Sequence, residues 1–169
     1  MASTPSQAAF IDALDRHRGI LFKVANAYCR DAASREDLAQ DTIVQLWRAY
    51  RTFDGRRTFS TWMYRIAVNV AISFHRRERR KTSHFALAEN TFLEEIPAPQ
   101  EPYDERMELL REIIDRLDEL DRPLMILYLD DRPYAEIADI LGISETNVAT
   151  KIGRLKQHLR RTVAAQGRG

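Results

Sequence analysis

The sequence predicts an all-α fold made of two small helical domains joined by a flexible acidic linker, with a helix-turn-helix in the C-terminal domain. Apolar residues recur at steps of three and four residues in several segments, which is the spacing of a helix face. No segment alternates apolar and polar residues as a half-buried strand does. A polar stretch that contains Pro97, Pro99 and Pro102 separates the two groups of helices. The predicted domains are residues 7–81 and 105–163, with residues 82–104 as the linker.

The first predicted helix spans residues 7–29. Its expected buried face consists of Phe10, Leu14, Leu21, Val24 and Tyr28. A second helix is predicted from Ser34 to Tyr50, because Ser34 is a good N-cap residue and Glu36 and Asp37 place carboxylates in the first turn.

The third predicted helix follows the break at Asp54-Gly55 and ends in a basic run, Arg76 to Lys81. Its expected buried face consists of Phe59, Met63, Ile66, Val70 and Phe74. The opposite face carries a polar stripe made of Trp62, Arg65, Asn69, Ser73 and Arg76. Such a stripe suits unpaired DNA, because an aromatic ring stacks on a base, an amide binds a base edge and arginines bind the backbone. The alternatives are that Trp62 packs in the core and that the basic run is a solvated helix end.

A further helix is predicted to begin near Asp104. Its apolar face consists of Met107, Leu110, Ile113, Ile114 and Leu117. Pro123 and Pro133 are expected in the first turns of the two helices that follow, where proline costs no backbone hydrogen bond.

The segment from Tyr134 to Leu155 predicts a helix-turn-helix. Gly142 can end the first helix in a left-handed conformation and Ser144 can cap the second, whose core face is Val148, Ile152 and Leu155. If the second helix enters a major groove, the residues near base edges are Glu145, Thr146, Ala149, Thr150 and Gly153. The residues expected near phosphates are Lys151, Arg154, Lys156, His158, Arg160 and Arg161. The alternative is an ordinary helical hairpin.

Charge is segregated along the chain, although the formal net charge is only +1. Residues 51–81 and 151–169 are basic, whereas residues 94–121 are acidic. Basic segments attract DNA and an acidic segment is repelled by it, so two DNA contacts with an intervening segment are expected. The alternative is that these blocks are solvated helix faces.

Several classes of function are not supported by the sequence. Cys29 is the single cysteine, and the histidines lack metal-ligand spacing, so neither a disulfide nor a bound metal is expected. No apolar run is long enough to insert into a membrane and no export signal stands out, which predicts a cytoplasmic protein. The sequence shows no nucleophile paired with a base, no paired carboxylates and no phosphate-binding loop. It therefore does not predict an enzyme, and no cofactor is expected.

Three motifs in order resemble regions two and four of bacterial RNA polymerase sigma factors of the extracytoplasmic-function group. They are SREDLAQDTIVQLW from Ser34, FSTWMYRIAVNVAISFHRRERR from Phe59, and the helix-turn-helix. The resemblance implies a subunit that binds core RNA polymerase, recognises promoter DNA and promotes melting. It also implies an anti-sigma factor as a further partner.

The resemblance assigns roles to matching positions. The residues implied to bind polymerase are Asp37, Leu38, Gln40, Asp41 and Leu46. Those implied to bind the minus-ten element are Phe53, Trp62, Arg65, Asn69, Arg76 and Arg77. Those implied to bind the minus-thirty-five element are Thr146, Ala149, Thr150, Lys151 and Arg154. Members of the family often carry a basic or serine-rich stretch after the position of Val148, whereas this chain has Ala149, Thr150 and Lys151. The resemblance therefore does not predict which promoter sequence is recognised.

Three other functions fit parts of the sequence. A helix-turn-helix regulator could bind duplex operators without joining polymerase, but it needs no base-stacking surface. A helical adaptor that binds only proteins leaves both basic segments unexplained. An enzyme acting on nucleic acid is the remotest alternative.

Overall fold

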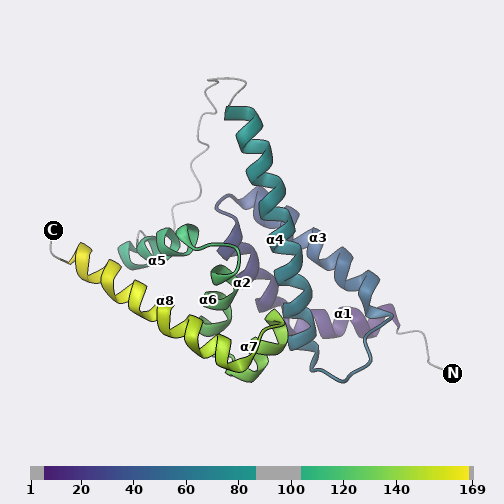
Figure 1. Ribbon diagram of the computed structural model, residues 1–169. Coiled ribbons are helices and arrows are strands. Elements are labelled where there is room, and N and C mark those ends of the chain that lie inside the picture. Colours follow the sequence, from purple (N-terminus) through teal and green to yellow (C-terminus); the bar gives the residue numbers. More distant parts are fainter. Residues whose placement is uncertain (1–5, 87–103, 168–169) are drawn as a thin grey trace. The chain divides into compact units, whose positions relative to one another are not determined.

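The structure is a computed structural model that describes residues 6–86 and 104–167, with only the backbone described at 82–86. Within these ranges every regular element is a helix, which confirms the all-α prediction (Figure 1). The chain divides into two compact units, Met1–Asp104 and Glu105–Gly169. No helix in the described ranges combines the length and the apolar character needed to span a membrane. Most of the predicted acidic linker lies outside the described residues.

The N-terminal unit is built around its longest helix, α4, which packs against α2 and α3 (Figure 1). Its helices are α1 (Gln7–Arg16), α2 (Arg18–Tyr28), α3 (Ala32–Tyr50) and α4 (Phe59–Ala86). Helix α3 begins earlier than predicted and α4 ends later, and the first predicted helix is divided into α1 and α2.

The prediction of a single helix over residues 7–29 is wrong, because the helix is interrupted at His17, between α1 and α2. The backbone amide of His17 bonds to Leu14 three residues back, as in a tightened last turn. The break lets Phe10 lie against Trp47 and Tyr50 of α3, with each pair of ring centroids 5.1 Å apart. Leu14 is half-buried on α1, whereas Leu21, Val24 and Tyr28 lie on α2, which packs against α3 and α4.

Helix α3 is capped by Asp31 rather than by the predicted Ser34. A carboxylate oxygen of Asp31 accepts a hydrogen bond from the backbone amide of Ser34 at 2.8 Å, and the helix begins at Ala32. That hydrogen bond is the main reason why the pKa of Asp31 lies below its ordinary value. The guanidinium of Arg35 also donates to the carbonyls of Cys29 and Arg30, which ties the start of α3 to the end of α2.

The buried face of α4 is wider than predicted and is rotated from the predicted position. Met63 and Phe74 are buried as expected, but Phe59, Ile66 and Val70 are only half-buried. The other buried residues of α4 are Thr61, Tyr64, Ala67, Val68 and Ala71. Contact with α2 and α3 together explains the width, since two neighbours cover more of a helix than one does. The helix also continues to Ala86, so the first five residues of the predicted linker, 82–86, are helical.

The C-terminal unit contains the predicted helix-turn-helix. Its helices are α5 (Glu105–Arg116), α6 (Asp121–Leu129), α7 (Tyr134–Leu141) and α8 (Glu145–Gln166). Gly142 has a φ of 68° at the end of α7, and the hydroxyl of Ser144 accepts from the Asn147 amide at 3.1 Å, so both predicted signals are confirmed. Pro123 lies in the first turn of α6 as predicted, whereas Pro133 is the N-cap of α7.

The core of this unit is formed by α6, α7 and α8, which pack against one another. Val148, Ile152 and Leu155 of α8 are buried, as the spacing predicts. The same core contains Leu124, Met125, Leu127 and Ile137, which are almost fully buried. Helix α5 contributes Ile113 and Ile114. Helix α8 is therefore held against the core along one face, while its opposite face remains exposed.

Candidate nucleic-acid and polymerase interfaces

Helix α3 presents an acidic and apolar surface, but it does not present all of the predicted polymerase-binding residues. Asp37 and Gln40 are exposed and Asp41 is half-buried. Leu38 and Leu46 are only 1% and 0% exposed, so neither side chain is available to a partner, and this part of the prediction is corrected.

The surface of α3 includes two apolar residues that the motif comparison missed. Val44 and Trp47 are 46% and 40% exposed. The helical spacing of the apolar residues in this segment does distinguish its surface from its core. Leu38 and Leu46 lie two turns apart with Thr42 between them, whereas Gln40, Val44 and Trp47 follow a different face.

An aromatic cluster lies where α3, the following loop and α4 meet. Phe53 and Trp62, both predicted to contact the minus-ten element, have ring centroids 5.0 Å apart. Tyr50 stacks on Phe53 with an angle of 13° between the ring planes, and Phe59 lies 5.3 Å from Trp62. Phe53 and Trp62 are half-buried, so the cluster combines packing with ring surface that remains accessible. Tyr50 and Phe59 were not predicted to belong to this site.

The loop that carries Phe53 is held by local hydrogen bonds. Gly55 has a φ of 72°, a conformation that glycine adopts without strain. A carboxylate oxygen of Asp54 accepts from the Arg56 amide at 3.0 Å. The hydroxyl of Thr58 accepts from the Thr61 amide at 3.3 Å at the start of α4. The loop therefore fixes the position of Phe53 relative to Trp62.

A polar stripe continues along α4 from Trp62. Arg65, Asn69, Ser73 and Arg76 are all exposed, as predicted from their spacing. Arg77 differs, because its guanidinium is 3.1 Å from a carboxylate oxygen of Asp41 and its charged carbon lies 5.7 Å from the centre of the Phe74 ring. Both partners of this ion pair are about half exposed, so a DNA phosphate can compete for Arg77 at little cost.

The exposed face of α8 carries most of the residues predicted to meet the minus-thirty-five element. Thr146, Ala149, Thr150 and Arg154 are exposed. The hydroxyl of Thr150 donates to the Thr146 carbonyl at 3.0 Å, which leaves its oxygen as an acceptor.

Lys151 differs from its neighbours on α8. Its ammonium nitrogen lies 3.8 Å from a carboxylate oxygen of Asp121 at the start of α6, and the two side chains are 31% and 30% exposed. Lys156, a further residue expected near phosphate, places its nitrogen 4.9 Å from the centre of the Tyr128 ring. Two of the predicted phosphate contacts therefore have partners inside the unit.

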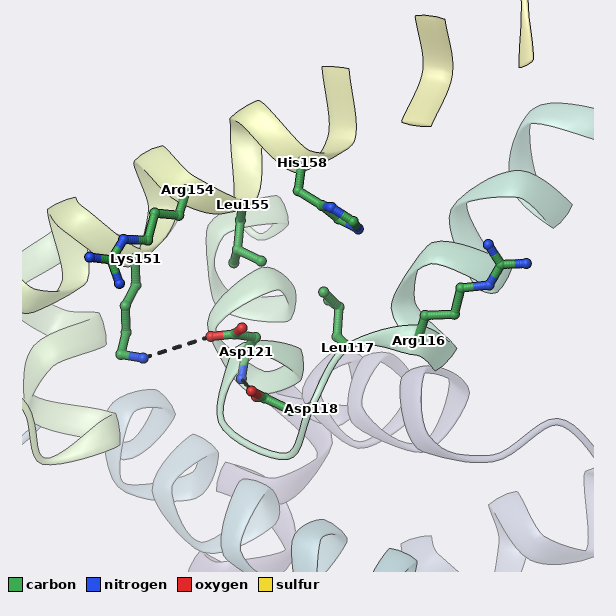
Figure 2. Close-up of a pocket in the computed structure, with 8 residues that line it drawn as sticks. All are labelled: Arg116, Leu117, Asp118, Asp121, Lys151, Arg154, Leu155 and His158. Atoms are coloured by element: carbon green, nitrogen blue, oxygen red, sulfur yellow. Dashed lines mark hydrogen bonds and ion pairs between the residues drawn. The ribbon is translucent and has the colours of Figure 1, made fainter. Parts of the chain in front are cut away.

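A cleft of about 360 Å³ surrounds the Lys151–Asp121 pair (Figure 2). Its lining residues are Arg116, Leu117, Asp118, Asp121, Lys151, Arg154, Leu155 and His158. The carboxylate of Asp118 accepts from the amides of Leu120 and Asp121, so it caps the start of α6. Burial raises the pKa of Asp121, and so does the neighbouring charge of Asp118, while Lys151 and Arg154 oppose the rise. Nothing in the helical periodicity of the sequence places these acids beside α8.

Each of the two units matches the model of a known protein family. Sigma-70 region 2 matches residues 13–81 and Sigma-70 region 4 matches residues 107–159. The two matches contain the aromatic cluster with the polar stripe and the helix-turn-helix, respectively.

Relatives match over nearly the whole chain. The RNA polymerase sigma factor CnrH of Cupriavidus metallidurans is 30% identical, over 94% of this chain and 88% of the relative. The ECF RNA polymerase sigma factor SigW of Bacillus subtilis is 28% identical, over 92% and 89%.

A solved structure has a similar fold. The sigma factor RpoE of Bartonella quintana, in complex with the anti-sigma factor NepR, aligns with a TM-score of 0.70 and 19% identity over 92% of this chain and 96% of that one. The chain belongs to the extracytoplasmic-function group of the sigma-70 family, the sigma factors that bind RNA polymerase and recognise promoters.

Proposed function

We propose that the two units divide promoter binding between them, with unpaired minus-ten DNA on the N-terminal unit and duplex minus-thirty-five DNA on α8. The observation that carries this division is the aromatic cluster at the start of the exposed polar stripe of α4. Aromatic rings bind bases by stacking, which requires that the bases leave the duplex. Helix α8 contains no Phe, Tyr or Trp and belongs to a helix-turn-helix, which suits a major groove.

On the N-terminal unit, the proposed minus-ten residues are Phe53, Trp62, Arg65, Asn69, Arg76 and Arg77. Phe53 and Trp62 offer ring surface to flipped bases, and Asn69 offers an amide that can bond to a base edge. The arginines bind the backbone. Flipping a base costs a few kcal/mol, an amount that stacking on an aromatic ring offsets, at about 1–3 kcal/mol per base.

The proposed polymerase surface consists of Asp37, Gln40 and Asp41 together with Val44 and Trp47. Carboxylates beside exposed apolar side chains suit a partner that offers both basic and apolar groups. The same surface needs a cover when the protein is free of polymerase, because exposed large apolar groups favour association. We therefore propose an anti-sigma factor as a regulatory partner, as in the solved complexes of RpoE with NepR and of CnrH with the cytosolic domain of CnrY.

On the C-terminal unit, the proposed minus-thirty-five residues are Thr146, Ala149, Thr150, Lys151 and Arg154. The first three lie near the N-terminus of α8, the part that reaches base edges in helix-turn-helix proteins. Arg154 is exposed and suited to phosphate. The protein acts as a binding subunit and catalyses no reaction itself, and its place of action is the bacterial cytoplasm, where polymerase and promoter meet.

The division is tested by reconstitution with core RNA polymerase. Wild-type protein is expected to co-purify with core enzyme and to direct transcription from particular genomic fragments. Asn69→Ala is expected to retain core binding and to lower open-complex formation, measured by permanganate reactivity of unpaired thymines. Asn26→Ala removes an exposed amide from α2 and serves as the matched control.

Two results would contradict the proposal. Binding to duplex DNA without binding to core enzyme would support a regulator that acts without polymerase. Equal loss of core binding and open complexes in the Asn69→Ala variant would make Asn69 a structural residue.

A further inference from the structure

The ion pair between Lys151 and Asp121 lies within the surface that we assign to duplex DNA. Figure 2 shows the two side chains pointing toward each other across the cleft, from α8 and from the start of α6. Each side chain is about 30% exposed, so the pair is less screened by solvent than Arg77–Asp41 on the N-terminal unit.

The two acids of the cleft have different roles. Asp118 is engaged by two backbone amides, at 2.9 and 2.8 Å, and so serves the local structure of the turn. Asp121 is the acid whose carboxylate approaches Lys151. Arg116, Arg154 and His158 also line the cleft, although the side chain of Arg116 points away from Asp121 in Figure 2. Asp121 is therefore the negative charge of the cleft that directly faces a cation of α8.

A negative charge in this position opposes DNA in two ways. It neutralises Lys151 in the free protein, so a phosphate must displace a carboxylate before it gains that contact. It also repels phosphate directly. Both effects act on the backbone contribution to affinity, which is independent of base sequence.

We propose that Asp121 competes with DNA phosphate for Lys151 and so weakens the binding of the C-terminal unit to duplex DNA of any sequence. Binding then depends more strongly on the base contacts made by the N-terminal residues of α8. Asp121 is thus a specificity-determining residue that acts through Lys151, and this inference rests on the proposed placement of duplex DNA on α8.

The test uses the full chain and a short fluorescent duplex of random sequence. Fluorescence anisotropy gives the dissociation constant over a series of monovalent salt concentrations. Asp121→Asn is expected to bind about two- to fivefold more tightly at low salt, the range set by a partly exposed ion pair. The slope of log affinity against log salt is expected to become steeper by about one, since one more cation becomes available to phosphate.

Asp131→Asn is the matched control, because it makes the same change in net charge at an exposed turn. Asp131 has a φ of 53°, a conformation that asparagine also tolerates, and it does not line the cleft. An equal gain in affinity from Asp131→Asn would overturn the proposal, because net charge alone would then explain the effect.

A double-mutant cycle tests whether Asp121 acts through Lys151. In a Lys151→Ala background the gain from Asp121→Asn is expected to shrink markedly, whereas an unchanged gain would overturn the competition. Lys151→Ala alone separates this inference from the placement of DNA. If that variant binds as wild type does while Asp121→Asn binds more tightly, Lys151 is not a phosphate contact and the competition fails. Unchanged affinity in Asp121→Asn, with weakened binding in Lys151→Ala, would reject the competition and leave DNA on α8.

Discussion

In the N-terminal unit the candidate DNA surface combines aromatic rings with exposed arginines, whereas the exposed face of α8 in the C-terminal unit carries cations and small polar side chains. Phe53 and Trp62 stand beside Arg65 and Asn69 in the first. The second has Thr146 and Arg154 but no Phe, Tyr or Trp. A stacked duplex hides the faces of its bases and displays only their edges, so aromatic rings are useful only where the strands separate. The difference therefore supports the proposed placement of unpaired bases on the N-terminal unit.

The two units also differ in how the cations on their candidate DNA surfaces are paired. Arg77 of α4 pairs with Asp41 in an exposed ion pair, which contributes little and is easily exchanged for a phosphate. Lys151 of α8 pairs with the less exposed Asp121, and Lys156 lies over Tyr128. Cations on α8 are therefore partly engaged before DNA arrives, which favours selective over general binding to duplex DNA.

The largest expected effect separates core from surface on α3. Leu46→Ala is expected to lower the free energy of unfolding of the N-terminal unit by about 2–5 kcal/mol, because the side chain is fully buried. Val44→Ala changes an exposed residue and is expected to alter stability by less than about 0.5 kcal/mol while weakening polymerase binding. Urea unfolding and core-enzyme binding measure the two effects. A stable Leu46→Ala variant that fails to bind polymerase would restore Leu46 to the polymerase surface.

The next effect breaks the aromatic contrast between the units. Trp62→Ala is expected to reduce open-complex stability by about 1–3 kcal/mol through lost stacking, and Trp62→Phe is expected to retain most of it. Permanganate footprinting measures the open complex, and thermal unfolding measures packing. Since Trp62 also packs against Phe53 and Phe59, a loss of stability that accounts for the whole loss of open complex would make its role structural.

Helix caps provide a smaller test that compares the units directly. Asp31→Ala and Ser144→Ala are each expected to cost about 0.5–2 kcal/mol of unfolding free energy, because each removes the acceptor for a backbone amide. Ser34→Ala is expected to cost less than Asp31→Ala, and the reverse order would reject the assignment of the α3 cap.

The Asp31 cap also has a definite pH dependence. The Ser34 amide holds the pKa of Asp31 below its ordinary value in the folded protein. Its contribution is therefore present above the pKa of the unfolded chain and is lost as pH falls through the folded pKa. Acid titration of stability in the wild type and in Asp31→Asn measures this loss, which the variant should not show.

The smallest expected effect concerns the stability of Asp121→Asn. Burial raises the pKa of Asp121, so its contribution to stability is present at low pH and is lost as pH rises through the folded pKa. At neutral pH the ionised carboxylate opposes folding despite its pairing with Lys151. The melting temperature of Asp121→Asn at neutral pH is therefore expected to equal or slightly exceed that of the wild type. A clear decrease would mean that the ion pair stabilises the unit.

The sequence by itself determined the helical class, the helix-turn-helix and the exposed stripe of α4. Gly142, Ser144 and the apolar positions of α8 act through contacts within one or two turns, so their spacing contains the structural information. The stripe from Arg65 to Arg76 follows the same rule.

Only the tertiary structure decided which apolar faces are covered and which charges meet. The break at His17, the buried positions of Leu38 and Leu46, and the width of the α4 core depend on neighbouring helices that are distant in sequence. The meeting of Asp121 with Lys151 requires that α6 and α8 pack together. Periodicity identifies residues that share a face, but the packing partner determines whether that face is core, surface or a site for DNA.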